Sequence, residues 1–300
     1  MKPLRIGTLA TAGDYGAQEV IKAAILASRY CSPSNDFDLV VYAKKGSSEG
    51  FSMDDMGRIA YYETGNTDTS EIRAAFEALR RGDINAIVTP KNSHDLMAMA
   101  KNYMNPDIER PGLIGGFPTM GGIRYVTDIG ATSRVDDPKV FAGLAELGRD
   151  YLIRHCGIAS PRIGLHNIST EHAYPTLQRA YELLDGFPGF VGYAEPAKFW
   201  AGEIDLLLID GFGGNSKLKD FERIGLMTVS MCADALSKAG YFDAAKALPG
   251  IMKARLSYDS YLISLLLGPG WVFRTHGNCK AEQLAKAFAM AVKHPIQEPY

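Results

Sequence analysis

Apolar and polar positions follow one repeated order along most of the chain. A short apolar run is followed by a turn with glycine, asparagine or aspartate, and then by a stretch with helical spacing of apolar residues. Clear apolar runs lie at 5–10, 86–89 and 162–167, before helices predicted over 16–29, 95–103 and 174–184. This order is typical of parallel β-α units, so the sequence predicts an α/β fold with a mostly parallel sheet.

The turns that follow the apolar runs are the expected positions of the chemistry. In open parallel sheets, ligands bind beyond the carboxyl ends of the strands. Polar or glycine-rich turns occur directly after apolar runs at 11–16, 89–94, 128–134, 167–172 and 210–216. We therefore expect these turns to form the functional site.

The segment 226–254 has a different pattern, with helical spacing and no intervening strand. It is interrupted at 248–250 by Leu-Pro-Gly, which predicts two helices joined by this break into a helical arm. We expect its apolar residues, such as Met227 and Met231, to pack in the core or against a second subunit. A surface for a partner protein is the alternative.

Composition excludes several classes of protein. Of the 300 residues, 46% are hydrophobic and 22% are charged, which is typical of a globular chain long enough for two lobes. The net charge of -2 argues against a nucleic-acid partner. No apolar run is long enough for stable membrane insertion, so a cytoplasmic location is expected. The four cysteines form no CxxC pair, which argues against a zinc cluster or a disulfide framework.

Several short motifs occur in one order along the chain: Asp-Ile-Gly-Ala at 128–131, Pro-Arg-Ile-Gly-Leu at 161–165, Gly-Glu-Ile-Asp at 202–205 and Asp-Gly-Phe-Gly-Gly-Asn at 210–215. Tyr-Asp-Ser-Tyr at 258–261, Leu-Leu-Gly at 266–268 and His-Gly at 276–277 follow. In this order and spacing, the chain resembles the PlsX phosphate acyltransferases from about residue 6 to 292. That family forms acyl phosphates from acyl-carrier-protein thioesters and inorganic phosphate.

The resemblance implies a three-layer α/β/α architecture related to phosphotransacetylases and to isocitrate and isopropylmalate dehydrogenases. It implies a single domain over 1–300 in two lobes, with the arm at 226–254 and an active site between the lobes. It also implies a homodimer or hetero-oligomer, no metal and no cofactor. An acyl thioester on a carrier or partner subunit, and inorganic phosphate, are the expected ligands. The arm then offers a surface for an acyl carrier as well as for a second copy.

Three segments depart from the family pattern. The glycine-rich turn of the family is replaced by Thr-Pro-Lys-Asn-Ser-His at 89–94. The acidic stretch that ends in Lys-Gly-Asn is shortened, and His172 stands in place of its lysine. A Gly-Gly-Ala-Pro segment is replaced by Leu-Ile-Ser-Leu at 262–265. The resemblance therefore indicates a divergent member of the family.

The turn at 89–94 is a candidate phosphate site. Lys91 offers positive charge, Asn92 and Ser93 offer polar side chains, and the following helix opens with backbone N–H groups that favour an anion. The alternative is a helix N-cap with a solvated lysine.

The turn at 210–215 is the second candidate. Its glycines allow close approach to a ligand, so Asp210 is expected to orient a donor or a histidine, and Asn215 to bind phosphate or the acyl carbonyl. An Asx-turn that only shapes the loop is the alternative. Asp128, Gly130 and His172 complete the predicted substrate-binding set.

His276 and Cys279 form the last candidate, near the start of the final predicted helix. A helix N-terminus and an imidazolium both stabilise a thiolate, so Cys279 has the local setting of a nucleophile with a lowered pKa. The PlsX-like subunit of the glycine reductase complex uses a cysteine that carries an acetyl group. We therefore expect acyl phosphate, in the first instance acetyl phosphate, to form through acyl-Cys279.

Three alternatives remain at this point. Cys279 can be a small, buried and inert residue. The reaction can be the direct PlsX transfer from acyl carrier protein to phosphate in phospholipid synthesis. The chain can also be a ligand-binding subunit without catalysis, because the glycine-rich turn and the family's lysine are lost.

Overall fold

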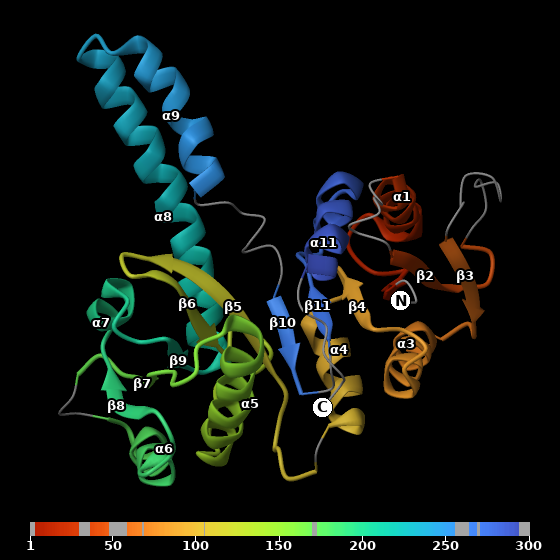
Figure 1. Ribbon diagram of the computed structural model, residues 1–300, viewed down its shortest axis with the longest axis horizontal. Coiled ribbons are helices and arrows are strands. Elements are labelled where there is room, and N and C mark those ends of the chain that lie inside the picture. The colour runs from red at the N-terminus through yellow and green to blue at the C-terminus, as the bar shows by residue number, and fades with distance from the viewer. Residues whose placement is uncertain are drawn as a thin grey trace.

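A computed structural model describes residues 4–29, 37–47, 59–67, 69–104, 106–169, 173–255, 264–268 and 271–293 (Figure 1). The strands are β1 (Leu4–Leu9), β2 (Phe37–Lys44), β3 (Ile59–Thr64), β4 (Ala86–Thr89), β5 (Gly112–Thr119), β6 (Gly122–Thr127), β7 (Ile163–His166), β8 (Phe190–Ala194), β9 (Leu206–Leu208), β10 (Ser264–Leu267) and β11 (Val272–Arg274). The helices are α1 (Gly16–Arg29), α3 (Ser70–Arg81), α4 (Ser93–Ala100), the 3-10 helix η1 (Lys101–Tyr103), α5 (Lys139–Cys156), α6 (Pro175–Leu184), α7 (Pro196–Ala201), α8 (Gly211–Lys238), α9 (Phe242–Arg255) and α11 (Ala281–Lys293).

One sheet of eleven described strands runs through the molecule in the order β3-β2-β1-β4-β11-β10-β5-β6-β9-β7-β8. The first lobe contains β1 to β4 and β11, and the second contains β5 to β9 (Figure 1). Strand β10 pairs antiparallel with β11 on one side and with β5 on the other, and so joins the lobes. Apart from these pairs and β5–β6, the described neighbours are parallel. The predicted fold class is confirmed.

Apolar side chains cover both faces of the sheet, as expected for parallel strands buried on two sides. On one face, Ile6 of β1 belongs to the cluster that contains Ile21 of α1 and Phe288 of α11. On the other face, Leu9 of the same strand belongs to the cluster that contains Phe76 of α3. Helices therefore lie on both sides of the sheet, and the molecule has the expected three layers.

Helix α3 illustrates how the sequence determines one of these layers. Ile72, Phe76 and Leu79 recur at helical spacing and are all buried against the sheet. Burial of each such side chain contributes about 1.5–3 kcal/mol. The helix ends at Gly82, whose φ of 74° is a conformation that glycine adopts without a steric penalty.

Helices α8 and α9 form an antiparallel pair that projects from the second lobe (Figure 1). The turn between them lies at 239–241, where Gly240 has a φ of 87° and ends α8. The predicted break at 248–250 is therefore wrong, because Pro249 lies inside α9. Helix α8 is also continuous from Gly211, so the predicted turn at 210–216 is the beginning of this same long helix.

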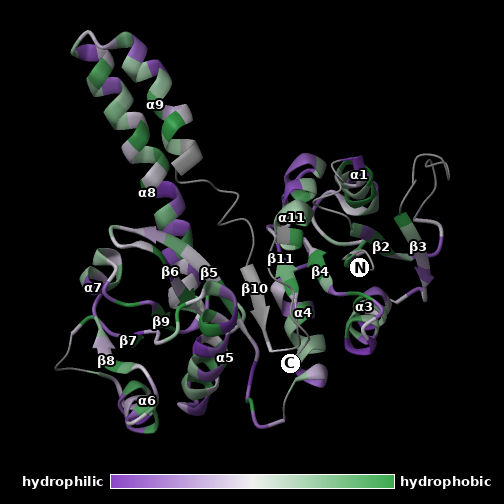
Figure 2. Cartoon of the chain, in the orientation of Figure 1, coloured by the Kyte–Doolittle hydropathy of each residue, from purple (hydrophilic) through white to green (hydrophobic). Residues whose placement is uncertain are grey.

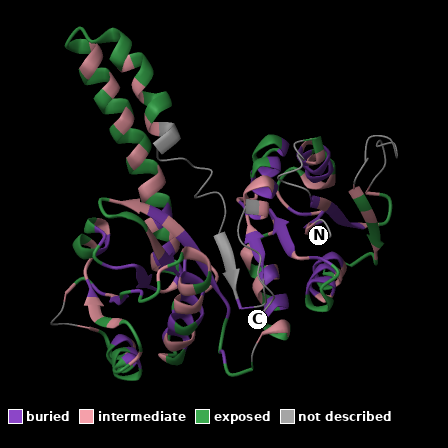
Figure 3. Cartoon of the chain, in the orientation of Figure 1, coloured by how far each residue is buried: buried purple, intermediate pink, exposed green. Residues whose placement is uncertain are grey.

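The projecting pair is exposed over most of its length (Figure 3). Apolar and polar residues are interleaved along both helices (Figure 2). No residue described between 219 and 252 is buried, so packing in the core is the wrong interpretation of its apolar residues. The large exposed ones are Ile224, Leu226, Met227, Met231, Tyr241, Phe242 and Ile251. Neither these helices nor any other described helix is long and apolar enough to cross a membrane.

Candidate functional site

Three loops of the first lobe meet beyond the carboxyl ends of β1, β4 and β11. The backbone N–H of Asp14 donates to the carbonyl of Gly277 at 2.8 Å, and that of Thr275 donates to the carbonyl of Thr89 at 2.9 Å. Gly13 has a φ of 83°, and a Cβ there would lie 2.9 Å from the Gly277 oxygen. The close packing of these loops therefore depends on a residue without a side chain.

The predicted phosphate turn belongs to this group of loops. Asn92 is the N-cap of α4, and its side-chain oxygen accepts the N–H of Asp95 at 2.9 Å. The Lys91 ammonium lies 3.1 Å from the carboxylate of Asp95. Ser93 is the first residue of α4, and His94 is exposed. Capping, the alternative to phosphate binding, accounts for Asn92, and an ion pair engages the charge of Lys91.

Asp128 organises the backbone of the second lobe. It is fully buried, its Oδ1 accepts the N–H groups of Leu113, Gly130 and Ala131, and its Oδ2 accepts that of Thr132. Burial raises the pKa of Asp128, although these N–H groups favour the ionised form. Main-chain donors on both of its oxygens give Asp128 a structural part in this loop, and its contact with substrate stays a prediction.

The loop that Asp128 holds lies directly against the N-terminus of α8. A Cβ on Gly211 would overlap the Thr132 carbonyl, and one on Gly214 would overlap the Asp128 carbonyl. Gly130, with a φ of 128°, faces Asn215, whose Cβ would be 3.5 Å from a Cβ on the glycine. Sequence reasoning expected glycines here for a ligand, and the structure uses them for contact between two segments of backbone.

Asp210 occupies the N-cap position of α8. Its Oδ1 accepts the N–H of Gly213 at 2.7 Å, which is the Asx-type arrangement considered as the alternative. No described histidine pairs with Asp210. A different carboxylate lies beside a histidine in this structure.

That carboxylate is Glu222, in the fourth turn of α8. Its Oε1 lies 3.5 Å from Nε2 of His276, which follows β11 in the first lobe. The contact connects the two groups of loops, and both side chains are partly exposed. Sequence reasoning did not identify Glu222, because it lies inside a helix with no motif of its own.

Cys279 lies in the turn that begins at His276, and its backbone N–H donates to the His276 carbonyl at 3.2 Å. Its side chain is buried, and burial raises the pKa of the Cys279 thiol. The charge of Arg274 and a hydrogen bond with Thr275 act in the opposite direction but do not outweigh burial. The expectation of a lowered thiol pKa is therefore wrong.

Two further polar residues lie near the carboxyl end of β7, where His166 is the last residue of the strand. Nε2 of His166 is buried without a hydrogen-bond partner among the described residues. Burial, followed by the nearby charge of Lys217, lowers the pKa of His166 to about 4. Lys217 of α8 lies over the ring of Trp200 at 5.9 Å, and burial lowers its pKa. The charge of Asp220 acts in the opposite direction but does not outweigh burial, so the half-buried charge of Lys217 is only partly compensated among the described residues.

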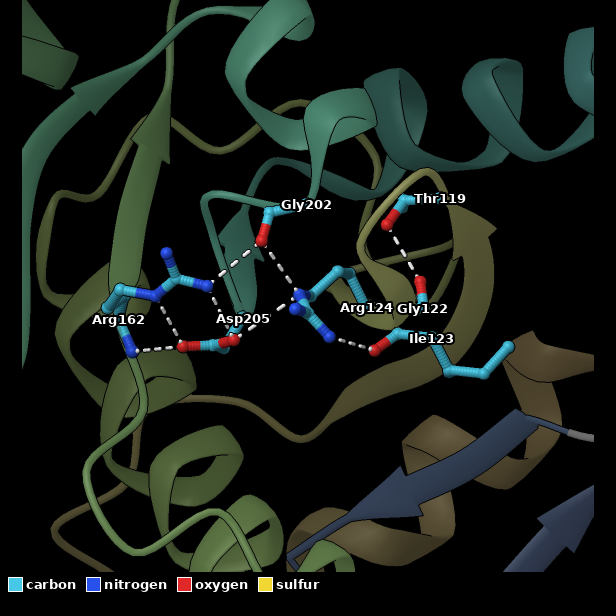
Figure 4. Close-up of polar contacts among 7 residues, drawn as sticks. All are labelled: Thr119, Gly122, Ile123, Arg124, Arg162, Gly202 and Asp205. Carbon is cyan, nitrogen blue, oxygen red and sulfur yellow. Dashed lines mark hydrogen bonds and ion pairs between the residues drawn. The ribbon is translucent and has the colours of Figure 1, made fainter.

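A separate network of polar contacts joins Arg124, Arg162, Gly202 and Asp205 in the second lobe (Figure 4). Asp205 lies between two arginines: Arg162 donates to both of its carboxylate oxygens, and Nε of Arg124 lies 3.3 Å from Oδ1. Both arginines also donate to the carbonyl of Gly202. Asp205 and the two arginines therefore connect β6, β7 and the segment before β9.

The predicted site residues fall into two groups. Lys91, Asn92, Ser93, His276 and Cys279 belong to the first lobe. The second-lobe group consists of Asp128, Gly130, Asp210 and Asn215. His172 lies outside the described residues. Within the described ranges, no group of three or more His, Cys, Asp or Glu residues is arranged to hold a metal ion.

Comparisons with known proteins agree on one type of relative. The family described as "Fatty acid synthesis protein" matches residues 4–298. A phosphate acyltransferase of Moorella thermoacetica is 29% identical over 97% of this chain and 92% of its own length. One of Aeromonas salmonicida is 32% identical over 75% of this chain and 68% of its own length.

Solved structures show the same fold at low sequence identity. The EutD phosphotransacetylase from Staphylococcus aureus is 12% identical, with a TM-score of 0.61 over 97% of this chain and 94% of its own. A branched-chain phosphotransacylase from Enterococcus faecalis V583 is 11% identical, with a TM-score of 0.60 over 97% of this chain and all of its own.

Proposed function

Since this chain belongs to the fatty acid synthesis protein family, with which the PlsX phosphate acyltransferases are grouped, we propose that it transfers an acyl group from a thioester to inorganic phosphate. The family predicted from the motifs is confirmed, and the protein is an acyltransferase. The direct transfer is our proposal for its chemistry, with acetyl as the first acyl group to test.

The observation that carries this proposal is the contact between His276 and Glu222. Asn215 lies on α8 two helical turns before Glu222, so both side chains extend from the same face of the helix. His276 from the first lobe lies against this face. Both lobes therefore contribute polar side chains to one place, which suits a reaction between two separate substrates.

In the proposed reaction, a phosphate oxygen attacks the thioester carbonyl carbon. A C–O bond forms, the C–S bond breaks, and the proton of hydrogen phosphate passes through His276 to the departing thiolate. The products are an acyl phosphate and a free thiol. Lys217 offers the half-buried positive charge that favours a dianion, and Asn215 offers an amide donor to the carbonyl oxygen.

The test is phosphate-dependent release of thiol from the purified chain with acyl-thioester substrates. We expect thiol release to require phosphate, and the ³¹P NMR spectrum to gain an acyl phosphate resonance in equal amount. Acetyl and long-chain thioesters on coenzyme A and on acyl carrier protein distinguish the acyl group and its carrier. Binding of phosphate or thioester without any turnover contradicts the proposal and indicates a ligand-binding subunit.

The second candidate is the two-step route through acyl-Cys279, as in the glycine reductase complex. Its support is the position of Cys279 in the turn that begins at His276. Its burial and raised pKa disfavour attack by this thiol, because the thiolate is the nucleophile. We therefore place the direct route first.

We also propose that the exposed apolar side chains of α8 and α9 form a homodimer contact. Large exposed apolar residues recur along both helices of this projecting pair, and such a gathering is typical of an interface. Met231→Asp is expected to convert a dimer to a monomer in analytical ultracentrifugation. Met120→Asp, at a residue that is 93% exposed and lies outside α8 and α9, is the matched control. A monomeric wild-type chain contradicts this part of the proposal.

A further inference from the structure

We infer that Glu222 is a positioning residue that fixes the ring orientation and tautomer of His276. This inference rests on the proposed function, since it assigns a partner to the group that transfers the proton. Glu222 does not touch the reacting atoms in this proposal. It acts through the imidazole.

Hydrogen bonds of the main chain hold the turn that contains His276. The His276 carbonyl accepts the N–H of Cys279 at 3.2 Å, and the next carbonyl, of Gly277, accepts the N–H of Asp14 at 2.8 Å. A Cβ on Gly277 would lie 3.0 Å from Oδ1 of Asp14, so this turn is closely packed. The backbone of His276 is therefore held by the first lobe, and its side-chain torsions are what remain to be fixed.

Glu222 supplies that constraint from the other lobe. Its Oε1 lies 3.5 Å from Nε2 of His276, and the two side chains are 20% and 31% exposed, respectively. Contacts of this kind are often long before substrate binds and shorten in the reactive complex. Asp210, the carboxylate first expected to orient a histidine, is engaged as the N-cap of α8. Glu222 is thus the described carboxylate that pairs with this imidazole.

The chemical consequence concerns the two ring nitrogens. A carboxylate beside Nε2 favours the tautomer with the proton on Nε2, which leaves the lone pair on Nδ1. Nδ1 then accepts the proton from hydrogen phosphate, and the negative charge of Glu222 stabilises the resulting imidazolium until the thiolate takes the proton. Loss of Glu222 therefore lowers the rate of the chemical step and leaves phosphate and thioester binding in place.

The position of the pair adds a second consequence. Glu222 lies on the same face of α8 as Asn215, whereas His276 belongs to the first lobe. The imidazole is oriented toward the α8 face only when the two lobes lie as they do in this structure. Glu222 therefore links the arrangement of the lobes to the reactivity of His276.

A series at one position tests the inference. Glu222→Met removes both the hydrogen-bond acceptor and the charge while keeping a side chain of similar size. Glu222→Gln removes only the charge. Asp234→Asn, at an exposed residue farther along the same helix, is the control. We expect kcat to fall about 100-fold in Glu222→Met and less in Glu222→Gln, with KM values for both substrates unchanged. Asp234→Asn is expected to retain wild-type kcat.

A second readout does not depend on activity. In ¹⁵N NMR of histidine-labelled protein, with His276→Gln used to assign the resonance, wild type is expected to carry the His276 proton on Nε2. Glu222→Met is expected to give a mixture of tautomers. An unchanged tautomer, an unchanged kcat, or an equal loss in Asp234→Asn overturns the inference. A wild-type chain without acyl transfer instead refutes the proposed function, and the NMR result still decides whether Glu222 orients His276.

Discussion

Asp205 accepts three hydrogen bonds from Arg162, from the backbone N–H at 2.8 Å, from Nε at 2.9 Å and from Nη2 at 3.0 Å. Burial by itself would raise the pKa of Asp205, but these bonds and the charges of Arg162 and Arg124 outweigh it and lower the pKa. The carboxylate is thus stabilised in its ionised form and fixes the segment before β9 to β7.

We expect Asp205→Ala to lower the free energy of unfolding by about 2–4 kcal/mol, because it leaves the arginines without their partner. Urea denaturation followed by circular dichroism measures the change. Asp83→Ala, which breaks an exposed ion pair with Arg81, is the control and should cost less than about 1 kcal/mol. Equal effects of the two substitutions would show that the network has no special role.

The buried His166 is expected to make the free energy of unfolding depend on pH between 6.5 and 4. Its pKa is about 4 in the folded chain, compared with 6.5 for the free side chain. Between these values the unfolded state binds more protons, so stability falls as the pH decreases from 6.5 to 4. A shift of this size corresponds to about 3 kcal/mol. Asp205, whose folded pKa is lowered, loses its contribution only at still lower pH.

The corresponding measurement is denaturation of wild type and His166→Gln at pH 7, 5.5 and 4.5. We expect the wild type to lose stability over this series and His166→Gln to lose clearly less. His94→Gln, at an exposed histidine, should follow the wild type. The same slope in all three proteins would mean that His166 is not the titrating group.

Gly214 is a position where the packing of the site excludes a side chain. A Cβ there would overlap the Asp128 carbonyl, so Gly214→Ala is expected to separate α8 from the loop that Asp128 holds. We expect a loss of more than about 2 kcal/mol in stability and a severe loss of acyl transfer.

Gly250→Ala is the matched control, because no atom lies within 4 Å of a Cβ at that helical position. It should leave activity unchanged and raise stability by up to about 1 kcal/mol. Full activity of Gly214→Ala would mean that the close contact is not needed for the site.

The apolar pattern predicted three of the eleven described strands, because a buried parallel strand requires an uninterrupted apolar run. The runs at 5–10, 86–89 and 162–167 correspond to β1, β4 and β7. The turn of the arm was misplaced, because Pro-Gly is usually a helix breaker, whereas the chain reverses at Gly240 and continues helically through Pro249.

The site was predicted less completely, because local motifs identify loops but not the contacts between them. The sequence identified the loop of Asp128 and the turn at Asp210, yet both carboxylates accept backbone N–H groups. Glu222 and Lys217 were missed because they lie within a helix and belong to no motif. Their importance depends on the segments that pack beside them, and those segments are distant in the sequence. Only tertiary structure provides that information.

Lys217 is the cation that we expect to bind the phosphate dianion. Burial outweighs the nearby charge of Asp220, so the half-buried charge of Lys217 is only partly compensated and an incoming anion stabilises it. We expect Lys217→Met to raise the KM for phosphate about tenfold or more and to leave the KM for thioester within about twofold. Initial rates at varied phosphate measure the effect. Lys246→Met, exposed on α9, is the control, and an unchanged phosphate KM in Lys217→Met would exclude this role.

Cys279 distinguishes the direct route from the two-step route. Because the thiol is buried and its pKa is raised, we expect iodoacetamide at pH 7 to modify the exposed Cys232 well before Cys279. Cys279→Ala should retain acyl transfer within about threefold, as should the control Cys232→Ala. If Cys279→Ala instead abolishes activity, and wild type incubated with acetyl phosphate gains an acetyl adduct that hydroxylamine removes, the acyl group passes through Cys279 and the direct route is wrong.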